Sequence, residues 1–99
     1  MGKIIKRTVR WEASADAKKY RLYWSTQGPV GYDSEFFEIE NKSLVILPDE
    51  VPSFPKIAEN VELGITAVNE VGNESDLTIA RVYVDFTVPE APKAITVED

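Results

Sequence analysis

Apolar and polar residues alternate along two short runs near the start of this chain, at residues 8–11 and 20–24. A period of two places successive side chains on opposite faces of an extended strand. Each run therefore predicts a strand with one face in a core and one face in solvent. We expect the indole of Trp11 to lie between two facing sheets, and its expected neighbours are Leu22, Ile65 and Val84.

The same alternation recurs later in the chain. Residues 35–40 and 43–47 predict two further strands, and residues 60–68 and 78–87 predict a hairpin whose loop contains Gly72. Val84 and Phe86 fall on one face of the last strand, whereas Leu77 and Ile79 have the opposite parity. We therefore expect a β-bulge near residues 80–81, which would restore the parity.

A proline-rich segment, residues 48–57, separates these two groups of strands. Its prolines lack amide donors, so the segment cannot continue inside a sheet and is expected to be a crossing loop. Val51, Phe54 and Ile57 are spaced by three, which predicts a single helical or 3₁₀ turn. In that turn Phe54 would cap one end of the core.

Composition narrows the functional classes. The 99 residues suit one domain, and 43% hydrophobic residues suit a folded core. With no cysteine and no histidine, the chain lacks thiolate ligands, disulfides and the usual general base. A net charge of −6 disfavours nucleic acid, and no apolar stretch is long enough for membrane insertion. We find no catalytic or phosphate-binding motif, and expect no enzyme activity, no cofactor and no metal site.

Three segments together resemble a fibronectin type III domain, and the likeness covers residues 8–86. They are residues 9–13 with Trp11, residues 20–24, and residues 65–75. The resemblance implies an all-β fold: a two-sheet antiparallel immunoglobulin-like sandwich of seven strands.

The chain departs from the family pattern in three places. Val61 stands where the family usually has a tyrosine that anchors the preceding loop, so we expect apolar packing by Phe54 to replace that anchor. Arg7 takes an apolar position, and its guanidinium is expected at the sandwich edge. Residues 1–6 leave the first strand short or missing.

Residues 1–87 are expected to form the domain. Residues 88–99 resemble a linker and the first strand of a following repeat. Residues 94–97 of this segment are expected either to extend as a free tail or to dock where a first strand is wanted, in the same or a neighbouring molecule.

The resemblance implies a non-catalytic module of a larger surface or secreted protein, which acts as a spacer or binds protein or carbohydrate beside neighbouring domains of its parent chain. The alternatives are an accessory domain of a bacterial hydrolase or phage structural protein and a stand-alone intracellular interaction domain. The compartment stays open, with the extracellular space or cell envelope favoured.

Loops at the end of a sandwich are the expected binding surface, here residues 13–18 and 69–76. Glu38 and Glu40 are instead expected to pair across strands with Lys19 and Arg21. The candidate partner-binding residues are Tyr23, Asp16, Lys18, Glu70, Asn73 and Glu74.

Overall fold

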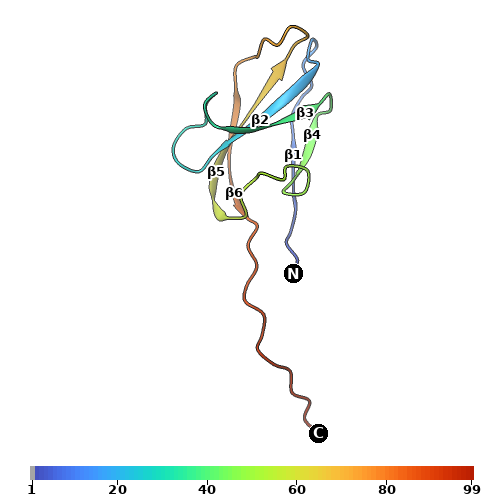
Figure 1. Cartoon of the computed structure of the whole chain (residues 1–99), viewed down its shortest axis with the longest axis vertical. Helices are drawn as coiled ribbons and strands as arrows, with labels where there is room; N and C mark the ends of the chain where they lie inside the picture. The colour runs from blue at the N-terminus through green and yellow to red at the C-terminus, as the bar shows by residue number, and fades with distance from the viewer. Residues whose placement is uncertain (1) are drawn as a thin grey trace.

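The chain is an all-β sandwich of two antiparallel sheets in the computed structural model, which describes residues 2–99 (Figure 1). One sheet has the strand order β1-β4 and the other has the order β3-β2-β5-β6. The predicted all-β sandwich of two antiparallel sheets is therefore confirmed, with six strands in residues 2–99 in place of the seven that the family resemblance implies. The strands are β1 (Arg7–Arg10), β2 (Lys19–Ser25), β3 (Glu35–Glu40), β4 (Leu44–Leu47), β5 (Ala58–Val68) and β6 (Thr78–Asp85).

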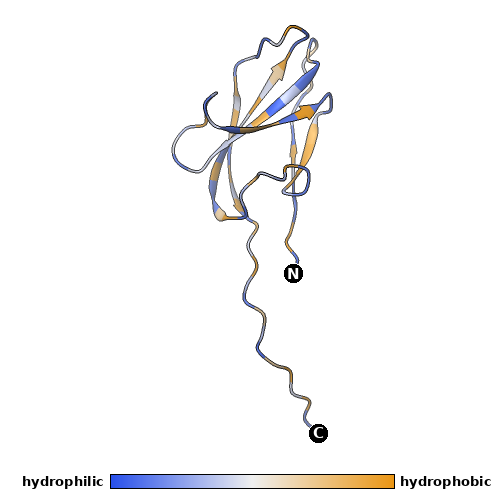
Figure 2. Cartoon of the chain, in the orientation of Figure 1, coloured by the Kyte–Doolittle hydropathy of each residue, from blue (hydrophilic) through white to orange (hydrophobic). Residues whose placement is uncertain are grey.

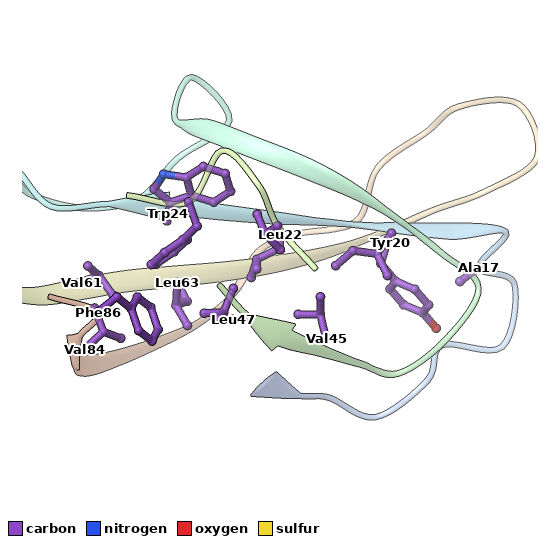
Figure 3. Close-up of a cluster of buried hydrophobic side chains, with 13 residues drawn as sticks. Ala17, Tyr20, Leu22, Trp24, Val45, Leu47, Val61, Leu63, Val84 and Phe86 are labelled. Atoms are coloured by element: carbon purple, nitrogen blue, oxygen red, sulfur yellow. The ribbon is translucent and has the colours of Figure 1, made fainter. Parts of the chain in front are cut away.

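The core lies between the two sheets, where one face of every strand supplies apolar side chains. On β2 the inward positions are Tyr20, Leu22 and Trp24, all of which are buried. Facing them from the two-stranded sheet are Val45 and Leu47 of β4 (Figure 3). The alternation predicted for residues 20–24 therefore places its apolar face as expected.

The proline-rich segment closes one end of this core. Two successive turns form it, in which the Val51 amide donates to Pro48 O at 3.2 Å and the Phe54 amide donates to Val51 O at 2.9 Å. Phe54 is 2% exposed, and its ring centroid lies 5.2 Å from that of Trp24 and 5.8 Å from that of Phe86. The predicted cap by Phe54 is confirmed, on turns rather than on a helix.

The predicted bulge near residues 80–81 is wrong. Strand β6 pairs with β5 in continuous register from Ala58 opposite Asp85 to Ile65 opposite Thr78. The change of parity at Leu77 has another cause, because the outer face of the four-stranded sheet is also partly covered. A Cβ atom built on Gly64, on that outer face, would lie 2.7 Å from Leu77 Cδ2.

The loop between β2 and β3, together with β3 itself, covers the outer face beside Leu77. The Tyr23 ring packs against Tyr32 of this loop, with centroids 6.1 Å apart, and against Phe36 of β3 at 5.2 Å. The Arg21 guanidinium lies 4.9 Å from the centroid of the Phe36 ring. Tyr23 is consequently only 1% exposed, although strand alternation placed it on a solvated face.

The outer edge of β1 has no strand beside it. β1 pairs only with β4, and residues 2–6 precede it without forming a strand. The structure thus has six strands, and the expectation of a short or missing first strand is confirmed for the described residues. As predicted, Arg7 lies at the sandwich edge, where its Nη1 donates to Tyr83 O of β6 at 2.8 Å.

Trp11 lies just beyond β1 and is half-buried, because no strand covers that edge. Its ring packs on Tyr20, with centroids 5.5 Å apart, and Leu22 and Ile65 lie nearby. The prediction that the Trp11 indole contacts the core is therefore confirmed. The prediction that the two sheets enclose it fully is wrong.

Both termini leave the sandwich at the same end, which we call the termini end (Figure 1). Gly2 lies so close to the start of the tail that a Cβ there would be 2.7 Å from the Val88 side chain. Beyond Phe86 the tail extends away from the body, and apolar and polar segments alternate along it (Figure 2). Ile95 is 90% exposed and Val97 is 88% exposed, so this part of the tail does not pack on the sandwich in this chain.

Candidate interaction surface

The two loops predicted as a binding surface lie together at the end opposite the termini, which we call the loop end (Figure 1). Strands β1 and β2 are joined there by residues 11–18, and β5 and β6 by residues 69–77. The Lys18 amide donates to Val68 O at 2.8 Å, which brings the base of the first loop to the base of the second. The fold therefore unites the two predicted segments.

The loop between β1 and β2 is held by Tyr20. The Tyr20 side chain is 2% exposed, and its hydroxyl oxygen accepts a hydrogen bond from the Ser14 amide at 2.9 Å. Because the ring is fixed in the core, this bond sets the path of the loop above it. Asp16 and Lys18 of the same loop are exposed.

The tip of the loop between β5 and β6 has its own hydrogen bonds. Asn69 Oδ1 accepts from the Asn73 amide at 2.8 Å and from the Val71 amide at 3.2 Å. Gly72 has a φ of 95°, a left-handed conformation that favours glycine. Glu70 and Asn73 are exposed on this ordered tip.

Glu74 ties this loop to the outer face of the sheet. One carboxylate oxygen, Oε2, accepts from the hydroxyls of Tyr23 and Thr66, the latter at 2.6 Å. The other, Oε1, accepts from Arg21 Nη1 at 3.2 Å. Three side chains of the sheet thus converge on one carboxylate. We assign Glu74 the role of a structural anchor for the loop.

Tyr23 belongs to the same internal cluster. Burial raises the pKa of its hydroxyl, and the hydrogen bond to Glu74 adds to the effect. The premise that Tyr23 is exposed is wrong, because Tyr32 and Phe36 cover it. We therefore leave Tyr23 and Glu74 out of the proposed contact surface, which keeps Asp16, Lys18, Glu70 and Asn73.

Cross-strand pairing is observed at Glu38 of β3. Lys19 Nζ lies 3.1 Å from Glu38 Oε1, and Arg21 Nη2 lies 2.9 Å from Glu38 Oε2. Hydrogen bonds from Lys19 and then Arg21 lower the pKa of the Glu38 carboxyl. The expected pairing with both cations is confirmed for Glu38, which is thereby internally neutralised. It is wrong for Glu40, which lies opposite Lys19 in the register but forms no ion pair within residues 2–99.

Sequence reasoning missed a groove between the sheets, beside the free edge of β1. It has a volume of about 640 Å³. Val9 and Trp11 form one wall, and the opposite wall includes Ile65 of β5 and the first residues of β6. Thr78 and Ala80 have the inward parity of β6, and their small side chains leave this space open, whereas Val82 and Val84 fill the core nearer the termini end. The weak sequence signal is this change from small to large inward residues.

Another carboxylate, that of the buried Glu62 of β5, holds the loop between β2 and β3. Glu62 Oε1 accepts from the Val30 amide at 2.7 Å, and Oε2 accepts from Arg81 Nε at 2.9 Å. The Val30 amide and then the Arg81 guanidinium lower the pKa of Glu62. The carboxylate form is therefore favoured by folding.

We expect Glu62→Gln to weaken the acid dependence of stability. A carboxyl whose pKa is lowered by folding contributes stability above its unfolded pKa of about 4.3, and this contribution is lost as the pH falls through the folded pKa. Urea unfolding from pH 7 to pH 3 should show a shallower loss of stability for the variant. Glu59→Gln, at an exposed position of the same strand, is the control. Identical pH profiles for Glu62→Gln and the wild type would contradict this assignment.

Fold and surface together define the chain as a two-sheet antiparallel β-sandwich with ordered loops at one end. A comparison with known protein families, characterised proteins and solved structures finds no match. Within residues 2–99 no helix has the length and apolarity to span a membrane. In the same described part of the chain, no group of three or more acidic side chains is arranged to hold a metal ion.

Proposed function

We propose that this chain is a non-catalytic binding module of the fibronectin type III kind, part of a larger surface or secreted protein, and that it presents its loop end to a protein or a carbohydrate. The two-plus-four strand arrangement supports the family resemblance noted for residues 8–86. The observation that carries the binding role is the pair of loops, each held from below by a buried or half-buried side chain.

The two loops are ordered before any partner binds, which is the physical reason to expect binding there. Tyr20 fixes one loop and Glu74 fixes the other, so ordering them on binding requires little further loss of conformational entropy. The exposed side chains above these anchors include both signs of charge and an amide, in Asp16, Lys18, Glu70 and Asn73. Such polar groups suit hydrogen bonding to a protein surface or to sugar hydroxyls.

The segments that flank the sandwich leave the loop end uncovered. Gly2 and Val88 lie against each other at the opposite end, and the tail extends away from the loops (Figure 1). The exposed loop residues Asp16, Lys18, Glu70 and Asn73 are therefore open to a partner in this chain.

The test is the quadruple substitution of Asp16, Lys18, Glu70 and Asn73 by Ala. The wild-type chain is screened on arrays of purified oligosaccharides and purified proteins, and each ligand found is measured again with the variant. We expect binding to fall at least tenfold. The matched control is Lys56→Ala with Glu59→Ala, two exposed residues towards the termini end. Binding that survives the loop substitutions but not the control substitutions would overturn the proposal.

A further inference from the structure

We infer that the groove beside β1 is a docking site for the C-terminal tail of a second copy of this chain, which adds residues 94–97 as an antiparallel strand on β1. This inference concerns a different surface from the loop end and stands independently of the proposed function. Three observations identify the occupant. They are the free edge of β1, the reach of the chain between Phe86 and Ile95, and the opposite charges of β1 and the tail.

The free edge of β1 offers unpaired backbone groups. The Trp11 amide donates to Ser43 O at 3.1 Å, in the register that pairs Val9 with Val45. Because hydrogen-bonded pairs alternate along an antiparallel ladder, the amide and carbonyl groups of Thr8 and Arg10 point away from β4. They form a template for one more strand.

Apolar side chains of the groove are also left partly uncovered. Val9 and Trp11 are half-buried and line it. An added strand would pack further apolar side chains against both. The tail has the matching pattern, because Ile95 and Val97 share one face of an extended strand and are both almost fully exposed.

Chain length excludes docking of the tail in its own groove in this direction. β1 runs from the termini end towards the loop end (Figure 1), so an antiparallel neighbour must enter from the loop end. The 11 residues of β5 span ~36 Å, whereas the eight residues between Phe86 and Ile95 span at most ~29 Å. Ile95 therefore cannot reach the loop end of its own groove. The bridge from Arg7 to Tyr83 O also closes the groove at the termini end.

Charge selects the antiparallel direction. In the antiparallel register that sets Ile95 opposite Trp11 and Val97 opposite Val9, both apolar side chains face the groove. Asp99 then lies opposite Arg7, and Glu98 lies opposite Thr8, between two arginines of β1. The parallel direction would bring the same two carboxylates towards Glu12, with repulsion in place of attraction. A second copy docked in the antiparallel direction satisfies both the apolar and the charged parts of the surface.

The experiment uses the full chain. Sedimentation velocity over a range of concentrations should show an associated species whose fraction rises with concentration. It is a dimer if two chains exchange tails with each other, and a longer assembly if each tail docks on the next chain. The double variant Ile95→Asp, Val97→Asp should stay monomeric. Val71→Asp, which changes an 80% exposed apolar residue outside the tail and the groove, should associate as the wild type does.

Two variants block the groove itself. Arg10→Pro removes an amide of β1 that points away from β4, so the pairing of β1 with β4 is kept. Ala80→Phe fills the groove from the opposite wall. If one variant misfolds, the other still tests the groove. Each should be monomeric alone. Mixing either with the tail variant, which has an intact groove, should restore a heterodimer, because one tail and one groove are then intact.

Spectroscopy locates the contact. In ¹⁵N spectra the indole N–H signal of Trp11 should shift with concentration, while that of the buried Trp24 serves as an internal reference. Amide exchange at residues 95–97 should slow in concentrated samples. A chain that is monomeric at millimolar concentration, association that survives the tail substitutions, or fast exchange throughout residues 95–97 would each overturn the inference. Slow exchange in a strictly monomeric sample would show docking within one chain and would also overturn it.

Discussion

Phe54→Ala is expected to lower the free energy of unfolding by about 3–5 kcal/mol, the range typical of a large aromatic side chain removed from a core. Phe54 is 2% exposed and lies between the rings of Trp24 and Phe86. It comes from a loop that lies outside the paired strands and is joined to them by only a few backbone hydrogen bonds. Its loss therefore leaves a cavity and also releases the crossing segment between the two sheets.

Urea unfolding followed by tryptophan fluorescence measures this effect, because Trp24 is in direct contact with Phe54. Ser53→Ala, at the exposed neighbouring position, should change stability by no more than about 0.5 kcal/mol. Unchanged thermal stability of Phe54→Ala would show that packing by this ring does not replace the tyrosine anchor expected from the family resemblance at Val61.

Glu74→Ala is expected to lower the free energy of unfolding by about 1–3 kcal/mol, the penalty for leaving buried hydrogen-bonding groups without a partner. The carboxylate accepts from the hydroxyls of Tyr23 and Thr66, both of which are almost fully buried. Arg21 also loses one of its two carboxylate partners. The loop between β5 and β6 should become locally mobile as a result.

Glu70→Ala is the matched control, because Glu70 is exposed and lies on the same loop. Amide exchange should quicken at residues 73–75 in Glu74→Ala and stay unchanged in the control. A double-mutant cycle with Tyr23→Phe isolates the contribution of the hydroxyl, since the two losses should be less than additive. Strict additivity, or equal effects of the two Glu substitutions, would contradict the role of Glu74 as an anchor.

Strand positions could be predicted because each strand repeats its apolar residues with a period of two. Residues 35–40 coincide with β3, and the turn glycine Gly72 has the positive φ that its loop requires. Phe54 was identifiable as a cap, because prolines interrupt the sheet where the core still needs covering. These features depend on residues close together in the sequence and on the backbone properties of glycine and proline.

The candidate site was predictable only in part. The two loops were identified, and the exposed Asp16, Lys18, Glu70 and Asn73 lie on them. The internal role of Glu74 could not be predicted, because its hydrogen-bond partners lie 8, 51 and 53 positions away in the sequence. Pairings over such separations depend on how strands are ordered in the sheet.

The sequence by itself determined an all-β chain with a buried face on each strand, because alternation controls which side chains leave water. Only the tertiary structure decided that Tyr23 is covered on the outer face, that no bulge interrupts β6, and that a groove stays open beside β1. The alternation of apolar residues describes one strand at a time. Whether another element packs over a given residue, or leaves a groove beside it, depends on the order of the strands in the sheets and on the path of the loops.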